Sequence, residues 1–303
     1  MALGAGGLSA RYVRGIGAAQ DDGTTIDLVA EEEFERDQGA ASITVVIPTL
    51  NEAENLPHVL PRIPAWVDEV ILVDGLSTDD TIEVARRHRP DIKVVLESTP
   101  GKGAALRAGF RAARGHIIVM LDADGSTDPR EIPVFVGALL GGADIAVGSR
   151  FVQGGGTADM EWHRKLGNWV LTRLVRVGFG AKYSDLCYGY TAFWSDVFPY
   201  IDGDYTGFEV ETLIHIRALR ASLNVAEVPS FEAPRRFGVS NLRTVQDGGR
   251  VLRSITTEWC SHRLTSTQRR RGLASVERLP GARPGTPPFC DDIREVREVR
   301  SAR

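Results

Sequence analysis

The chain of 303 residues is 43% hydrophobic and 25% charged, which is typical of a globular protein with a sizeable core. Its 36 basic and 40 acidic residues give a formal net charge of −4, so the overall charge provides no attraction to nucleic acid. The three cysteines (Cys187, Cys260 and Cys290) lack metal-ligand spacing, and neither a signal peptide nor a bilayer-spanning apolar run is found, so we expect a cytoplasmic protein.

Composition divides the chain into three parts. Residues 1–41 are rich in Gly, Ala and acidic residues, which is typical of a flexible leader. Residues 266–303 mix Arg, Pro and Gly, which is typical of a flexible tail. We therefore expect one folded domain, at residues 42–265.

In the first half of this domain, short apolar runs alternate with helical patterns. Buried strands are predicted at 43–48, 67–75, 91–98, 116–124 and 143–150, with helices at 51–63, 77–88, 101–115 and 128–142. Asn51 is expected to cap the first helix. This alternation predicts an α/β fold, a Rossmann-like αβα sandwich around a mostly parallel sheet. Ligands bind beyond the carboxyl ends of such strands, so one cleft is expected to hold Asn51, Asp74, Asp122, Asp124 and Arg150.

After Arg150 the alternation ends. Helices are predicted at 161–180, 207–222 and 245–264, a strand at 223–233, and a compact aromatic segment at 183–194. The last helix presents Val251, Leu252, Ile255 and Trp259 on one side. Two interpretations stay open for that side, which either packs on the core or rests on a membrane surface.

The fourth predicted strand runs directly into Asp122 and Asp124, one residue apart. Two carboxylates so close repel each other unless a cation lies between them, so the pair is either a metal site or a polar turn that opens a helix. Followed by Gly125 and Ser126, the pair also resembles the nucleophile motif of haloacid-dehalogenase-like phosphatases. In that family, however, the motif closes the first strand of the domain.

An ordered set of motifs resembles glycosyltransferase family 2, especially its dolichol-phosphate (polyprenyl-phosphate) mannosyltransferase branch. Between residues 43 and 262 the chain reads VIPTLNEAENL, VDGLSTDDT, GKGAALRAGF, DADG, GSRF, DLCYGYTAF and RRFGVSNL. The resemblance implies a GT-A fold and an inverting, metal-dependent glycosyltransferase.

The resemblance also implies roles for individual residues. A nucleotide-sugar would be bound by Pro48, Asn51, Glu52, Asp74, Asp79, Lys102 and Ala123. Mg²⁺ or Mn²⁺ would be held by Asp122, Asp124 and Ser126. The phosphates of donor and acceptor would be bound by Arg150, Arg164 and Arg235. Arg150 and Asp185 are the catalytic candidates, with Asp185 as the base that a hydroxyl acceptor would need.

The chain departs from the family pattern at four positions. Gly75 and Leu76 stand where family members commonly have Asp-Gly, Ser126 replaces a Gln, and Thr191 replaces an Arg. These changes leave the nucleotide base and the acceptor open.

The expected reaction moves a hexose, mannose or glucose, from a GDP- or UDP-sugar to polyprenyl or dolichyl phosphate. The protein would then contact the cytoplasmic face of the membrane peripherally. Three alternatives stay open: transfer to a hydroxyl of a soluble saccharide or metabolite, a phosphatase, and a nucleotide-sugar-binding module without catalysis.

Overall fold

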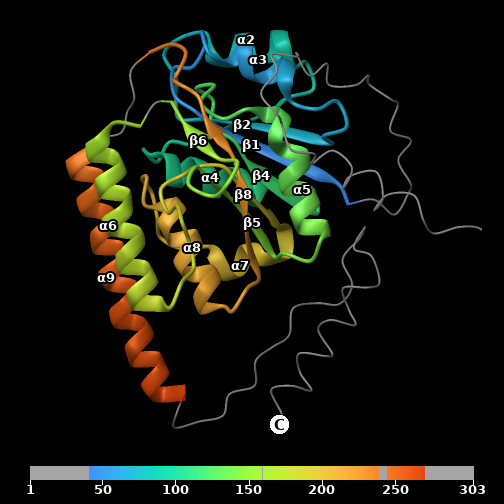
Figure 1. Cartoon of the computed structure of the whole chain (residues 1–303). Coiled ribbons are helices and arrows are strands. Elements are labelled where there is room, and N and C mark those ends of the chain that lie inside the picture. The colour runs from blue at the N-terminus through green and yellow to red at the C-terminus, as the bar shows by residue number, and fades with distance from the viewer. Residues whose placement is uncertain (1–40, 159, 239–243, 270–303) are drawn as a thin grey trace, which may run out of the picture. The chain divides into compact units, whose positions relative to one another are not determined.

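A seven-stranded sheet forms the centre of the fold, and helices flank it (Figure 1). The computed structural model describes residues 41–158, 160–238 and 244–269. Along the sheet the strands follow the order β3-β2-β1-β4-β7-β5-β8. Their bounds are β1 Ile43–Thr49, β2 Glu69–Asp74, β3 Lys93–Leu96, β4 Ile117–Met120, β5 Ile145–Ser149, β7 Thr191–Trp194 and β8 Val225–Pro229. All neighbouring pairs are parallel except those made by β7, which confirms the predicted α/β fold with a mostly parallel sheet.

Strand β7 was not predicted as a strand. It is antiparallel to both β4 and β5, and all four of its residues are buried. So short an apolar run carries no periodicity that separates a strand from other buried structure. Because β7 runs against β4, its first residue, Thr191, pairs with Met120 at the end of β4. The segment before β7 therefore reaches the edge of the sheet at which β4 ends.

Among the described residues, seven of the eight α-helices overlap predicted ones, and the short helix Phe198–Ile201 was not predicted. These helices are α2 Leu56–Val59, α3 Thr81–His88, α4 Lys102–Ala112, α5 Ile132–Leu140, α6 Trp162–Phe179, α7 Phe198–Ile201, α8 Val210–Arg220 and α9 Thr244–Arg269. A second, two-stranded sheet pairs β6 (Gly156–Thr157) with β9 (Phe231–Glu232). The two longest helices, α6 and α9, lie side by side (Figure 1). The domain boundary predicted at residue 265 falls inside α9, and residues 1–40 and 270–303 lie outside the described residues.

Asn51 does not cap the first helix, because α2 begins only at Leu56. Asn51 instead has a left-handed backbone with φ 57°, a conformation that Asn tolerates better than most residues. Its side-chain Oδ1 accepts a hydrogen bond from the backbone N–H of Thr78, at 2.8 Å. Asn51 thus joins the loop after β1 to the loop after β2.

Helix α9 buries half of the side chains on its apolar side. Val251 and Ile255 are 5% and 4% exposed, whereas Leu252 and Trp259 are 44% and 38% exposed. The core-facing interpretation therefore holds for Val251 and Ile255 but not for Leu252 and Trp259. No helix within the described residues combines the length and the apolarity that crossing a membrane requires.

Candidate active site

A cleft of about 220 Å³ lies beyond the carboxyl ends of the central strands. It is lined by seven of the predicted site residues, namely Lys102, Asp122, Asp124, Ser126, Arg150, Arg164 and Arg235. They come from separate parts of the chain, since parallel strands bring their ends to one edge of the sheet. The structure therefore brings together the predicted metal ligands and the predicted phosphate-binding cations.

Asp122 is paired with a lysine from another element. The Nζ of Lys102, the first residue of α4, lies 2.6 Å from Asp122 Oδ1 and 2.8 Å from Glu211 Oε1 of α8. Burial alone would lower the pKa of Lys102, but the attraction of the two carboxylates outweighs it and raises that pKa. Burial raises the pKa of Asp122, while Lys102 opposes this shift. Lys102 thus places its ammonium group directly beside the first aspartate.

Asp124 is held by two different neighbours. Its Oδ1 accepts hydrogen bonds from the backbone N–H and the hydroxyl of Ser126, at 3.0 and 2.6 Å. Its Oδ2 lies 3.3 Å from a guanidinium nitrogen of Arg235, and Arg235 also pairs with Glu52. Burial raises the pKa of Glu52, and Arg235 counteracts this. Each aspartate of the pair therefore has its own cation, Lys102 for one and Arg235 for the other.

The oxygen donors at this point fit a divalent metal ion. Asp122 and Asp124 keep 24% and 23% of their side-chain surface exposed, both face the cleft, and the hydroxyl of Ser126 lies beside them. In the part of the chain that the structure describes, no group of three or more His, Cys, Asp or Glu side chains has metal-binding geometry. Proteins usually bind Mg²⁺ through one or two carboxylates, and the phosphates of the substrate provide further ligands. The residues thus suit Mg²⁺ or Mn²⁺ bound together with a diphosphate.

Of the residues predicted to bind the nucleotide-sugar, Lys102 alone lines the cleft; the others are Pro48, Asn51, Glu52, Asp74, Asp79 and Ala123. Asp74 is 1% exposed, and its Oδ2 accepts a hydrogen bond from the backbone N–H of Ser77 at 2.9 Å. Its Oδ1 is buried with no hydrogen-bond partner in the structure. Asp79 accepts hydrogen bonds from Thr81 and from the backbone N–H of Ala53, which lower its pKa against the raising effect of burial.

Pro48 and Ala123 provide backbone near the cleft. Pro48 is a half-buried residue of β1, and Ala123, 4% exposed, separates the two aspartates. Pro48 lies near the end of β1, and Asn51, Asp79 and Ala123 belong to the loops that follow β1, β2 and β4.

Arg150 and Asp185 form a buried ion pair. Two guanidinium nitrogens of Arg150 donate to the two carboxylate oxygens of Asp185, at 2.7 and 2.9 Å, and a third lies 3.0 Å from Glu232. Asn168 of α6 donates a further hydrogen bond to Asp185 at 3.0 Å. Arg150 and Asp185 are 4% and 1% exposed. This pair ties the end of β5 to the segment before β7, to β9 and to α6.

Several cleft residues were missed in the sequence, among them Glu211, Asn168 and Gly189. Glu211 is a buried acid at the start of α8, and an acid in an otherwise apolar stretch is the one available signal. A Cβ on Gly189 would lie 2.7 Å from both Asp122 Oδ2 and Lys102 Nζ. A larger residue at this position would displace the ends of the Lys102 and Asp122 side chains.

More than half of the chain matches a known protein family. The model of glycosyl transferase family 2 matches residues 44–203, which include the acid pair, Lys102 and Arg150. The chain belongs to glycosyltransferase family 2. Its sheet, with β7 inserted antiparallel, is therefore a GT-A fold.

Two relatives in glycosyltransferase family 2 cover most of the domain. The polyprenol monophosphomannose synthase of Mycolicibacterium smegmatis is 34% identical over 231 residues, which are 69% of this chain and 87% of that protein. The undecaprenyl-phosphate mannosyltransferase of Micrococcus luteus is 33% identical over 233 residues, which are 72% of this chain and 93% of that protein.

Among solved structures, a glucosyl-3-phosphoglycerate synthase from Mycobacterium tuberculosis shares the fold of this family 2 member. That complex with Mn²⁺, UDP and glucosyl-3-phosphoglycerate has a TM-score of 0.56 and 24% sequence identity, and the match covers 73% of this chain and 80% of that one. The family and the fold give no support to the phosphatase alternative, because the acid pair follows an inner strand of a GT-A sheet.

Proposed function

We propose that this glycosyltransferase moves a hexose from a nucleotide-diphosphate sugar to polyprenyl phosphate, with inversion at the anomeric carbon. The observation that carries the proposal is the gathering of Lys102, Arg150, Arg164 and Arg235 around two aspartates in one cleft. Such a site suits two phosphorylated ligands better than a neutral acceptor. The names of the two relatives, both of which refer to polyprenyl-type phosphates and mannose, support the same acceptor class.

On the donor side, Asp122 and Asp124 would hold Mg²⁺ or Mn²⁺ with the help of Ser126. When bound, such an ion neutralises the charge that develops on the departing nucleoside diphosphate. The side chains of Lys102 and Arg235, now paired with the aspartates, would turn their charge toward the diphosphate. The unpartnered Oδ1 of Asp74 would accept an N–H of the nucleotide base.

On the acceptor side, a phosphate is already an anion and needs no general base. This matters because Asp185, the base candidate for a hydroxyl acceptor, already accepts hydrogen bonds from Arg150 and Asn168 away from solvent. Arg164 lines the cleft from α6 and would bind the acceptor phosphate. The acceptor oxygen would then attack the anomeric carbon from the side opposite the leaving diphosphate, which inverts the configuration.

The test incubates the full chain with Mn²⁺, polyprenyl phosphate and a panel of labelled GDP- and UDP-hexoses. We expect the label from one donor to partition into organic solvent as a glycolipid. Label that stays in water on an added saccharide would favour the soluble-acceptor alternative. Donor binding without any transfer would favour the binding module.

A variant of the acid pair tests the metal assignment. We expect Asp124→Ala to abolish the Mn²⁺-dependent binding of the nucleotide-sugar, measured by calorimetry, because one of two carboxylate ligands is lost. The matched control is Asp128→Asn, since Asp128 caps a short helical turn and pairs with Arg130 outside the cleft. Equal affinities for the wild type and Asp124→Ala would refute the assignment.

A further inference from the structure

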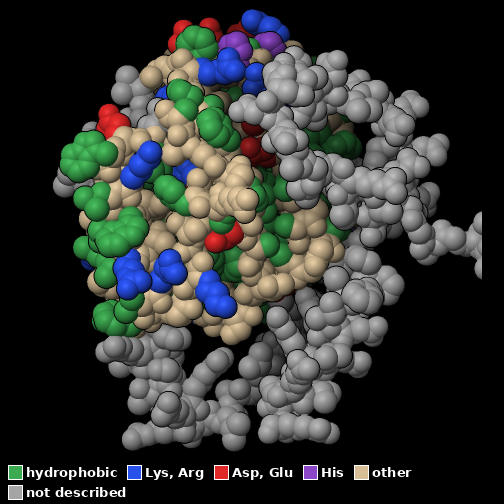
Figure 2. All heavy atoms as spheres, in the orientation of Figure 1, with side chains coloured by type: hydrophobic (Ala, Val, Ile, Leu, Met, Phe, Trp, Pro, Cys, Tyr) green, Lys and Arg blue, Asp and Glu red, His purple; other side chains and the backbone are tan. Residues whose placement is uncertain are grey.

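Helix α6 presents its apolar side chains to solvent. Trp162, Trp169 and Val177 are 76%, 64% and 73% exposed, and Leu166, Val170 and Leu174 are each at least 42% exposed. These positions repeat at spacings of three and four residues, so they share one face of the helix. Figure 2 shows hydrophobic side chains gathered over this part of the molecule, with Lys and Arg side chains beside them.

The opposite face of α6 is buried and partly polar. Asn168 and Thr172 are 4% and 5% exposed, and Asn168 is hydrogen-bonded to Asp185. A helix that only covers a domain would turn its tryptophans inward and its amides outward. The inverted arrangement leaves a contiguous apolar surface exposed, which marks an interaction site. Trp259 of α9 lies against Gly178, so this surface continues onto α9.

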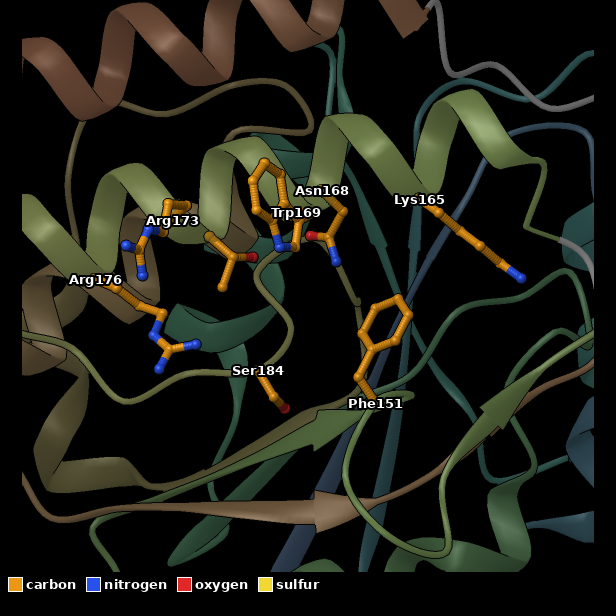
Figure 3. Close-up of a pocket in the computed structure, with 8 residues that line it drawn as sticks. Phe151, Lys165, Asn168, Trp169, Arg173, Arg176 and Ser184 are labelled. Atoms are coloured by element: carbon orange, nitrogen blue, oxygen red, sulfur yellow. The ribbon is translucent and has the colours of Figure 1, made fainter.

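The charge of α6 has one sign only. From Trp162 to Phe179 the helix contains no acidic residue, whereas the whole chain carries a net charge of −4. A pocket of about 370 Å³ lies along its edge. Figure 3 shows Lys165, Arg173 and Arg176 extending from α6 beside Trp169, with Phe151 and Ser184 on the facing segments. An apolar face bordered by cations is complementary to lipid tails beneath anionic headgroups.

We propose that α6 docks this protein on the surface of an anionic bilayer. The exposed tryptophans and aliphatic side chains would enter the boundary between headgroups and acyl chains, and Lys165, Arg173 and Arg176 would contact lipid phosphates. Tryptophan prefers this interface because its ring is apolar and its N–H can meet water. A second copy of the chain fits this face less well, since a two-fold contact would place the cations of α6 against each other.

The docking face adjoins the cleft. Arg164, Asn168 and Leu171 line the cleft from the same helix, and Asn168 borders the pocket in Figure 3 as well. A bilayer in contact with α6 would therefore lie next to the cleft. This orientation suits an acceptor whose phosphate stays at the membrane surface, but the docking itself does not depend on the proposed reaction.

The test is sedimentation of the full chain with vesicles in the absence of any donor. Vesicles of phosphatidylcholine alone are compared with vesicles that also contain phosphatidylglycerol. We expect binding to the anionic vesicles, weakening with added salt, and reduced about tenfold or more in Trp162→Ala/Trp169→Ala and in Lys165→Glu/Arg173→Glu/Arg176→Glu. The matched charge control, Arg86→Glu/Arg87→Glu on the exposed side of α3, should bind like the wild type.

Circular dichroism and the release of nucleoside diphosphate from the donor in detergent-free buffer show that the variants are folded. Failure of glycolipid synthesis with intact vesicle binding would contradict the proposed function alone. Failure of the wild type to bind anionic vesicles would overturn the docking alone. The docking proposal would also be overturned if the lipid-free protein were a dimer that dissociates in Trp162→Ala/Trp169→Ala. In that case α6 would contact a second copy of the chain.

Discussion

At the scale of single residues, Leu76 has an unusual backbone. Its φ is 64°, in the left-handed region, and its side chain is 53% exposed. The family motif commonly has glycine at this position, with Asp before it, whereas this chain reads Gly75-Leu76. Leu76 therefore adopts a backbone conformation that suits glycine better. An L-residue in this conformation costs about 1–2 kcal/mol.

Replacing Leu76 with glycine is expected to relieve this strain. The gain exceeds the extra entropy of the unfolded chain, which is about 0.4–1 kcal/mol, so Leu76→Gly should be slightly more stable than the wild type. The same change at Leu96, 63% exposed in β3 with an ordinary φ, should cost about 0.5–1 kcal/mol. Urea unfolding of both variants checks this, and equal losses of stability would contradict the strain at Leu76.

At the scale of elements, the pair of Arg150 and Asp185 joins the end of β5 to the segment before β7, to β9 and to α6. Burial alone would lower the pKa of Arg150, but the hydrogen bonds and attraction of Asp185 and Glu232 raise it. The guanidinium therefore stays charged in the interior. Since it also donates to the backbone carbonyl of Cys187, it fixes the segment that carries Gly189 into the cleft.

Asp185→Asn separates a structural role from a catalytic one. The substitution leaves the buried charge of Arg150 without its main partner, and we expect a loss of about 3 kcal/mol in the free energy of unfolding. The control is Glu83→Gln on α3, whose exposed pair with Arg87 should change stability by less than about 0.5 kcal/mol. An Asp185→Asn protein of unchanged stability that has lost turnover would instead indicate the catalytic base.

Helix α8, which brings Glu211 to the cleft, contains a buried histidine. Its Nδ1 lies 2.6 Å from the carbonyl oxygen of Glu211, and its Nε2 is buried without a hydrogen-bond partner in the structure. Burial lowers the pKa of His215, against the raising effect of the Glu211 carbonyl. The folded protein therefore binds this proton less readily than the unfolded chain does.

Lowering the pH should consequently reduce the free energy of unfolding, because His215 takes up a proton when the chain unfolds. Below the ordinary histidine pKa of about 6.5 the unfolded state binds the extra proton, so stability falls by up to about 1.4 kcal/mol per pH unit until the lowered pKa is reached. His215→Leu should lose less stability between pH 7 and pH 5.5 than the wild type, as measured by urea unfolding at each pH. Parallel losses in both proteins would show that other groups cause the effect.

At the scale of the whole molecule, the sequence predicted most of the sheet and the elements around the acid pair. Continuous apolar runs such as Ile43–Thr49 indicate buried parallel strands, and the polar residues at the ends of these strands predict where ligands bind. Two kinds of feature could not be predicted from the sequence. Strand β7 was too short to show a period, and Glu211 meets Lys102 only through a contact across 109 residues. Partners of this kind depend on tertiary packing, which no local pattern records.

The order of the strands also bears on the synthesis of the protein. The four neighbouring strands β3, β2, β1 and β4 all come from residues 43–120, so they can pair while the rest of the chain is still on the ribosome. Arg235, the cation of Asp124, is 111 residues further along, a delay of several seconds at about 5–20 residues per second. A chain halted before Arg235 would expose two aspartates without half of their neutralising charge. The cleft can therefore be complete only after Arg235 has been synthesised, well after the four neighbouring strands.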